Sequence, residues 1–208
     1  MTLYLVRHAQ SMPKRSLAFS EWSLSPVGVR QAEELAVLLA GLGITQLFSG
    51  PFTRSLQTAQ PFARQQGMPT IVLDDLRERL IMTDGGPPSD NLWRRSWLDF
   101  GYCPGGCESS LAAQSRITKA IQNLAARTEG TIAIFTHGNV IGLFLNSLQA
   151  TFGREQTEAL TNPDVLKILV KDGAFTWDDS FKLAGLQAIA THHDETPKEL
   201  LDPVVPSR

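Results

Sequence analysis

The sequence predicts an α/β fold, a three-layer sandwich in which a largely parallel central sheet is covered by helices on both faces. Two observations predict it. Short runs of β-forming apolar residues alternate along the chain with longer segments in which apolar residues recur at helical spacing. These longer segments are bounded by residues that start and end helices, such as Ser25-Pro26 before one of them and Gly67 after the next.

The expected elements follow from this alternation. Strands are expected over residues 3–6, 46–49, 70–73, 131–135, 165–170 and 183–189. Helices are expected from Pro26 to the glycines at 41 and 43, and over residues 51–66, 108–127 and 140–148. Pro61 lies inside the second of these helices and is expected to kink or subdivide it.

We interpret the chain as a single domain over residues 1–208 with a lid-like insertion at about 84–107. Within the insertion the alternation of strands and helices breaks down, because two runs of glycine and proline enclose only a short aromatic stretch. Long irregular connections of this kind are typical of lids and binding loops. A polar tail containing prolines is expected from Asp194 onward.

Composition and charge exclude several classes of protein. A chain with 42% hydrophobic and 19% charged residues is neither disordered nor fibrous. The longest strongly apolar stretch, Leu35 to Ile44, is about half as long as a membrane-spanning helix, and the N-terminus has no signal-peptide pattern. A net charge of −2 gives no strong attraction to nucleic acid or acidic membranes. We therefore expect a cytoplasmic protein with neither nucleic acid nor membrane as a partner.

Polar residues follow three of the expected strands. Arg7-His8 ends the first strand, Arg54 lies in the first helical turn after the second, and His137-Gly138-Asn139 ends the strand over 131–135. Ligands of open α/β sheets bind beyond the carboxyl ends of the strands. If these strands are parallel neighbours, two histidines and two arginines converge beside helix N-termini, which attract anions. This arrangement describes a phosphate site built without metal.

The same residues also have a structural interpretation. A single histidine at a strand end is more often a satisfied structural residue than a catalyst, and most arginines simply cover helix surfaces. The position of Arg54 favours a functional interpretation instead. The positive N-terminal end of a helix disfavours a cation in its first turn, which indicates that Arg54 serves a ligand.

These residues stand in short motifs that resemble those of the histidine phosphatase superfamily, the phosphoglycerate-mutase-like enzymes. Arg7-His8-Ala9-Gln10-Ser11 resembles the family's Arg-His-Gly-Glu-Thr signature, and Thr136-His137-Gly138-Asn139 resembles its second histidine motif. The further matches, in the family's order, are Leu24-Ser25-Pro26-Val27-Gly28 with Gln31-Ala32, Ser49-Gly50-Pro51-Phe52-Thr53-Arg54 with Gln57-Thr58-Ala59, Leu76-Arg77-Glu78-Arg79, and Gly106 with Glu108-Ser109. Together they run in order from residue 3 to about residue 145.

The resemblance implies a phosphoglycerate-mutase-like fold and a phosphoryl-transfer site. His8 is then the nucleophile that forms a phosphohistidine. Arg7, Arg54 and His137 hold the phosphoryl oxygens and neutralise the charge that develops on them. No cofactor or metal is needed.

Three further residues of these motifs have implied roles with open alternatives. Glu78 is the general acid that protonates the leaving oxygen and later activates water. Its alternative is an exposed ion pair with Arg77 or Arg79. The Gly138 amide and Asn139 either add hydrogen bonds to the substrate or simply cap a helix.

Departures from the family pattern favour a phosphatase over a mutase. Ala9 replaces the usual glycine, and Lys14 stands where mutases tend to carry asparagine. Glu78 lacks the Tyr-Gly or Phe-Gly pair that commonly follows it in mutases and in sugar-bisphosphatases. Trp93-Arg94-Arg95 lies closer to Glu78 than the mutases' paired arginines do. The expected function is metal-independent hydrolysis of a small phosphorylated metabolite. The alternatives are a mutase-type phosphotransferase and a catalytically silent phosphate-binding module, and homodimer formation is left open.

The role of the insertion is not determined by the sequence. Cys103 and Cys107 have no neighbouring histidine or further cysteine, so a zinc site is not expected, while a disulfide between them is left open. The aromatic side chains of the insertion either line an apolar wall for the leaving group or pack the insertion itself. These aromatic residues are Trp93, Trp97, Phe100 and Tyr102.

Overall fold

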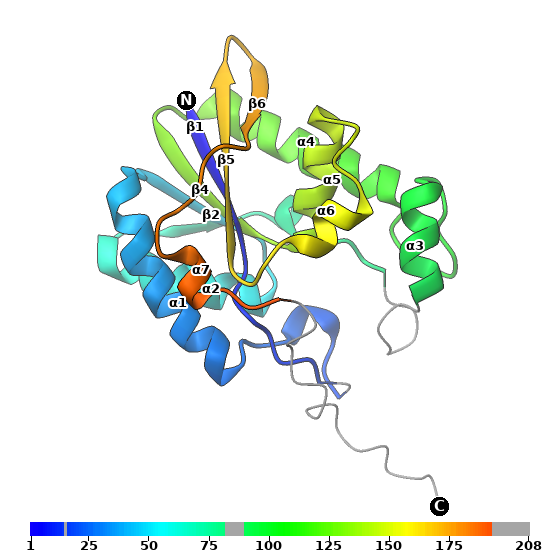
Figure 1. The fold of residues 1–208 in the computed structure, drawn as a ribbon, viewed down its shortest axis with the longest axis horizontal. Helices are drawn as coiled ribbons and strands as arrows, with labels where there is room; N and C mark the ends of the chain where they lie inside the picture. The colour runs from blue at the N-terminus through cyan, green and yellow to red at the C-terminus, as the bar shows by residue number, and fades with distance from the viewer. Residues whose placement is uncertain (15, 82–89, 193–208) are drawn as a thin grey trace, which may run out of the picture.

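A computed structural model describes residues 1–14, 16–81 and 90–192. Its centre is a six-stranded sheet with the strand order β3-β2-β4-β1-β5-β6 (Figure 1). The strands are β1 (Thr2–Arg7), β2 (Gln46–Ser49), β3 (Thr70–Val72), β4 (Thr131–Thr136), β5 (Asp164–Lys171) and β6 (Ala174–Asp178). The first four run parallel to one another, whereas β5 pairs antiparallel with both β1 and β6.

The central strands are buried on both faces, as a parallel sheet requires. In β1, Leu3 and Leu5 belong to one apolar core, and Tyr4 and Val6 belong to the other. Successive side chains of a strand point to opposite faces, so one short strand contributes to both cores. This accounts for the nearly continuous apolar run at the start of the sequence.

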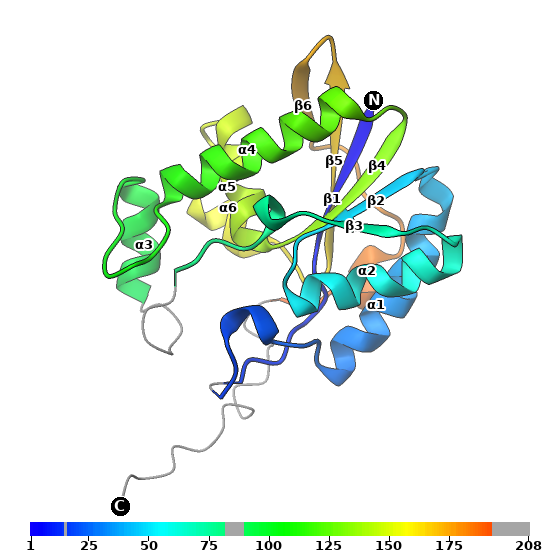
Figure 2. The ribbon, with the colours of Figure 1, turned by 180° about the vertical axis from the view of Figure 1, so that it is seen from behind.

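Helices cover both faces of the sheet. On one face α1, α2 and α7 pack over the core that contains Tyr4, and on the other α4 and α5 pack over the core that contains Leu3, with α6 beside α5 (Figures 1 and 2). These helices are α1 (Pro26–Leu39), α2 (Thr53–Gln66), α4 (Ser110–Arg127), α5 (Gly138–Leu148), α6 (Arg154–Ala159) and α7 (Leu186–Ile189). The predicted three-layer sandwich is confirmed.

Local signals account for most boundaries. The Ser25 hydroxyl accepts a hydrogen bond from the Gly28 N–H and caps α1, as expected from Ser25-Pro26. Gly67 ends α2 in the left-handed conformation. The helix continues through Pro61, so this proline does not subdivide it.

The C-terminal third holds the largest errors of the sequence analysis. Residues 183–189 were expected to form a strand, but they contain a turn and the short helix α7, whose Leu186 packs into the core of the α1 face. The strand β6 was missed. It forms a hairpin with β5 through Asp172-Gly173, both with positive φ, and this dipeptide is a hairpin signal that the analysis overlooked. The helix α6 was also missed.

The insertion contains a helix, α3 (Asp90–Leu98), where only an irregular excursion was expected. It lies at the N-terminal end of α4, away from the sheet (Figures 1 and 2). The beginning of the insertion, residues 84–89, and the expected polar tail from Asp194 lie outside the described residues. Within the described ranges, no helix combines the length and apolarity needed to cross a membrane.

Candidate active site

The register of the parallel strands brings the two histidine motifs together. Arg7 at the end of β1 pairs with Thr136 at the end of β4. The His8 N–H donates to the Thr136 carbonyl at 3.1 Å, and the rings of His8 and His137 lie 5.2 Å apart between centroids. The strand β2 is the other neighbour of β4, so α2 begins at the same edge of the sheet. The expected convergence of strand ends therefore occurs.

The His8 ring is oriented by two hydrogen bonds. Its Nδ1 lies 2.7 Å from the carbonyl oxygen of Ala9, which can only accept, so Nδ1 carries the proton. In the neutral ring Nε2 then carries the lone pair, and it accepts a hydrogen bond of 3.1 Å from Arg54 Nε. The nitrogen with the lone pair therefore points into the group of cationic side chains.

Arg54 is held in the first turn of α2, with its side chain 2% exposed. Its Nη1 donates to the Phe19 carbonyl at 2.7 Å, and its guanidinium lies 4.3 Å from the centroid of the Phe19 ring and 5.1 Å from that of Phe52. Burial lowers the pKa of Arg54 to about 10, an effect that Glu78 opposes and Arg7 reinforces. Arg54 therefore remains a cation at neutral pH.

Arg7 packs against the start of α5. A Cβ on Gly138 would lie 2.8 Å from Arg7 Nε, so only glycine lets the helix approach this closely. Arg7 Nη1 donates to the Leu160 carbonyl, whereas its buried Nε has no partner among the described residues. Burial lowers the pKa of Arg7 to about 10, partly offset by Glu78 and Asp164.

His137 is fully buried at the N-cap of α5, and Phe52 lies edge-on to its ring at 5.1 Å. Neither ring nitrogen has a hydrogen-bond partner among the described residues. Burial, reinforced by Arg54, His8 and Arg7, holds the pKa of His137 well below its usual value, so the ring is neutral. A buried imidazole without a protein partner, beside two cations, fits an anion that would accept its hydrogen bond.

Glu78 is buried beside this group. Its Oε1 accepts from the Arg79 N–H at 2.8 Å and from the Val140 N–H at 3.2 Å, and its Oε2 accepts from the Asn139 N–H at 3.2 Å. Burial raises the pKa of Glu78, and these backbone bonds together with Arg54 and Arg7 oppose the rise. The alternative of an exposed ion pair is wrong, because the carboxylate is buried and its bonds here are to backbone amides.

The structure distinguishes the remaining candidates. The Asn139 side-chain nitrogen and oxygen are buried without a partner in the part of the chain that the structure describes, so this amide forms no helix cap there and stays a candidate for binding substrate. Arg94 and Arg95 are exposed, and Arg95 stacks on Tyr102 at 4.1 Å. Cys103 and Cys107 are free thiols, and the Cys103 thiol contacts the Cys107 carbonyl. Among the described residues, no group of three or more histidine, cysteine or carboxylate side chains is placed to hold a metal ion.

Several residues that shape the site were missed by the sequence analysis. Asn162 Nδ2 donates to the His8 carbonyl at 2.8 Å, and the Leu160 carbonyl anchors Arg7. Both lie more than 150 residues from the motif that they support, and no local pattern marks them. Phe52 had a signal, because it stands next to Thr53-Arg54 in a matched motif.

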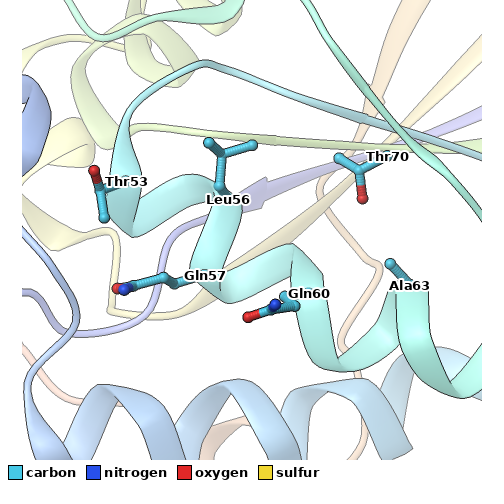
Figure 3. A pocket seen from close by; sticks show the side chains of 6 residues that line it. All are labelled: Thr53, Leu56, Gln57, Gln60, Ala63 and Thr70. Carbon is cyan, nitrogen blue, oxygen red and sulfur yellow. The ribbon is translucent and has the colours of Figure 1, made fainter.

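A separate hollow of about 370 Å³ lies on the outer side of α2 (Figure 3). It is lined by Thr53, Leu56, Gln57, Gln60, Ala63 and Thr70. None of these residues belongs to the group of buried charges, and Gln57 already accepts a hydrogen bond from the Leu24 N–H. The hollow is therefore distinct from the candidate active site.

The fold and the site define an enzyme of phosphoryl chemistry built around a pair of histidines. The sequence profile of the histidine phosphatase superfamily (branch 1) matches residues 3–180, and the chain belongs to this family. A probable phosphoglycerate mutase GpmB of Proteus mirabilis is 29% identical over 163 residues, 71% of this chain and 74% of the relative.

Two solved structures share the fold. YhfR of Bacillus stearothermophilus superposes with a TM-score of 0.69 at 24% identity, covering 85% of this chain and 95% of that one. A phosphoserine phosphatase variant from Entamoeba histolytica, in complex with phosphoserine, gives a TM-score of 0.72 at 18% identity, covering 89% and 98%. These similarities are consistent with the phosphoglycerate-mutase-like fold expected from the sequence.

Proposed function

We propose that the protein is a cytoplasmic, metal-independent phosphomonoester hydrolase that acts through a phosphohistidine on His8. The observation that carries this proposal is the orientation of the His8 ring. Its protonated Nδ1 is held by the Ala9 carbonyl, and Nε2 presents its lone pair among Arg7, Arg54 and His137. The substrate is a small phosphorylated metabolite.

In the first step, the His8 Nε2 lone pair attacks phosphorus and the bond from phosphorus to the ester oxygen breaks. The leaving oxygen takes a proton from Glu78, whose pKa is raised by burial so that the acid form is accessible. Arg7, Arg54 and His137 donate hydrogen bonds to the phosphoryl oxygens. Negative charge that spreads over these oxygens is therefore stabilised by groups already in place.

In the second step, water attacks the phosphohistidine on the side that the alcohol has left. The Glu78 carboxylate formed in the first step takes a proton from this water, and the bond between phosphorus and Nε2 breaks. Inorganic phosphate is released, and both His8 and Glu78 return to their starting forms. The cycle consumes one water and needs no other reactant.

The relatives divide between hydrolysis and transfer. The curated relative is named a probable phosphoglycerate mutase, whereas the phosphoserine phosphatase of Entamoeba histolytica is named for hydrolysis. Exposure of Arg94 and Arg95 favours hydrolysis here, since these two arginines were the match to the mutases' paired arginines. A mutase would move phosphate within its substrate, from a bisphosphorylated primer, without net release.

The test is a panel of phosphomonoesters assayed for phosphate release with chelator present. Wild type is compared with His8→Ala and with His192→Ala, a matched control in which an exposed histidine is lost. We expect His8→Ala to lose about 10³-fold or more in kcat because the nucleophile is removed, while the control stays within about twofold of wild type. Equal rates for His8→Ala and wild type would end the proposal, and activity lost only in chelator would assign the chemistry to a metal.

A second measurement identifies the intermediate. Brief reaction with a labelled substrate should leave a label on His8 that is lost in acid and stable in base. A label that survives acid would place the phosphoryl group on a serine or threonine. Phosphate transfer without release from a bisphosphorylated primer would instead identify a mutase.

A further inference from the structure

Arg79 is a buried cation next to the proposed proton donor. Its side chain is 0% exposed. Its backbone N–H donates the shortest of the three hydrogen bonds to the Glu78 carboxylate, at 2.8 Å. The resemblance to known motifs gave this residue no role, and the sequence analysis considered it only as an ion-pair partner of Glu78.

The Arg79 guanidinium connects three parts of the molecule. Nε donates to the Glu108 carbonyl at 2.8 Å, just before α4, and Nη1 donates to Ser96 Oγ at 2.9 Å in α3. The Ser110 hydroxyl donates to the Ser96 carbonyl at 2.6 Å, which fixes α3 against the start of α4. The segment that carries Glu78 is thereby fastened to the insertion.

Burial of the Arg79 guanidinium in this position lowers the stability of the native state. Within the described ranges, Arg79 forms no ion pair within 4.0 Å, and its buried Nη2 has no hydrogen-bond partner. A buried cation with an unpaired donor destabilises the native state, and an apolar side chain of similar size is often more stable. A purely structural role is therefore a poor explanation for an arginine at this position.

We propose that Arg79 is a positioning residue for Glu78, fixing the proton donor relative to α3 so that it meets the leaving oxygen. This inference rests on the proposed hydrolase function. It also gives the insertion a role, because the Arg79 side chain joins α3 to the segment that carries Glu78.

Charges around the pair support this role. Glu78 faces Arg54 from α2 and Arg7 from β1, and it is the first charged group that opposes the burial-driven lowering of the Arg79 pKa. Arg79 also interacts with Cys107, Glu108 and Cys103. Its backbone N–H lowers the Glu78 pKa directly, and the opposite charges of Glu78 and Arg79 stabilise each other. Loss of the Arg79 side chain loosens that backbone donor and removes the cation, so it should raise the Glu78 pKa and move the pH optimum of kcat upward.

The test uses leaving groups that differ in their need for a proton. The phenoxide that leaves p-methoxyphenyl phosphate is more basic than the one that leaves p-nitrophenyl phosphate, so it needs protonation more, although the two esters have a similar shape. The variants are Glu78→Gln, Arg79→Met and Arg79→Lys. The matched control is Arg127→Met, because Arg127 is exposed in the last turn of α4, at the opposite end of that helix from Glu108.

We expect Arg79→Met to lose about tenfold in kcat on p-methoxyphenyl phosphate and less than about threefold on p-nitrophenyl phosphate, because only part of the proton donor's contribution is lost. Glu78→Gln should show the same selectivity more strongly, and combining the two changes should add little to Glu78→Gln. Arg79→Lys keeps the charge, so it should retain the wild-type pH optimum. Arg127→Met should leave kcat on both esters within about twofold of wild type.

Each failure has a distinct meaning. A wild type inactive on both esters ends the proposed function, and with it this inference. An active wild type whose Arg79→Met variant loses equally on both esters, at an unchanged pH optimum, assigns Arg79 to the fold alone. Should Arg79→Met not fold, Ser96→Ala removes the Nη1 acceptor with a small side chain, and the absence of leaving-group selectivity in that variant would equally overturn the proposal.

Discussion

The cationic group at the strand ends and the region around Glu78 are built in different ways. Arg7, His8 and His137 follow strands whose register is set by the backbone ladder of β1 and β4. Glu78 lies in a connection between β3 and the insertion, where it is held by amides of other segments and by the anchor at Arg79. The ladder places the proposed phosphate-binding side chains, whereas backbone amides and the Arg79 anchor place the proposed proton donor.

This difference suggests that the two regions act on different parts of the substrate, the phosphate and the leaving group. Phosphate is common to all phosphomonoesters, so the groups that bind it can belong to the rigid sheet. The leaving group differs from one substrate to the next, and the proposed donor Glu78 is joined through Arg79 to α3, at the periphery (Figure 2). Variants at the strand ends should therefore affect all substrates alike, and variants near the insertion should discriminate between them.

Among variants that keep the proposed nucleophile, the largest effect is expected for Arg54→Met. Loss of the guanidinium removes charge-assisted hydrogen bonds to the phosphoryl group, each worth about 1.5–3 kcal/mol, so kcat/KM should fall about 10²-fold or more. Because the lost bonds are to phosphate, the factor should be the same for p-nitrophenyl and p-methoxyphenyl phosphate. Steady-state kinetics on both esters measure it.

Arg64→Met is the matched control for this prediction. Arg64 lies on the same helix, but it is exposed and pairs with Glu33 at the surface. Its loss should change kcat/KM by less than about twofold, as exposed ion pairs contribute little. A strong dependence of the Arg54→Met defect on the leaving group would contradict the proposed division.

The same contrast governs what the sequence predicts. His8 and His137 each directly follow an apolar strand, so local patterns placed them at one sheet edge, and the register then brought them together. The burial of Glu78 was not predictable, because its amide partners include Asn139 and Val140, about sixty residues away. Asn162, which binds the His8 carbonyl, carries no local signal at all.

The predicted elements show the same limit. Gly67 and Ser25-Pro26 are signals within a few residues of the boundaries that they mark, and those boundaries were correct. The apolar run over 183–189 fits either a strand or a buried helical turn, and only its packing against α1 decides between them. Periodicity therefore identified the sheet that builds the site, but not the packing of its C-terminal edge.

An intermediate effect is expected in the dependence of stability on pH. The pKa of His137 is depressed in the fold, so below about pH 6.5 the unfolded chain binds a proton that the native state does not. Falling pH should therefore lower the unfolding free energy, by about 1.4 kcal/mol per pH unit in this window. His137→Asn should remove this contribution, as measured by urea unfolding between pH 5 and 7, a range of about two units around the usual histidine pKa.

Glu78 should respond in the opposite direction. Its pKa is raised in the fold, so its contribution to stability is present below the usual glutamate pKa and is lost as pH rises through the folded value. Glu78→Gln should therefore increase the fall of stability with acid, whereas His137→Asn should diminish it. If both variants changed the pH dependence of the unfolding free energy in the same direction, the opposite pKa shifts of His137 and Glu78 would be contradicted.

The smallest effect is expected at Trp97 in the insertion. Its ring packs edge-on against Trp93 and Phe100, at 6.0 and 5.7 Å, and its indole nitrogen has no partner among the described residues. If these aromatic rings line the path of the leaving group, Trp97→Phe should change the KM of substrates with large leaving groups by about fivefold, the effect of a small change in an apolar pocket.

Inhibition by inorganic phosphate separates this effect from damage at the strand ends. Phosphate has no leaving group, so its inhibition constant should be the same in Trp97→Phe and wild type. Trp177→Phe is the control, because Trp177 packs against Phe152 on the antiparallel edge of the sheet. A phosphate inhibition constant that moved together with KM would mean that α3 acts on the cationic group itself, and the separation between phosphate binding and leaving-group selection would then be lost.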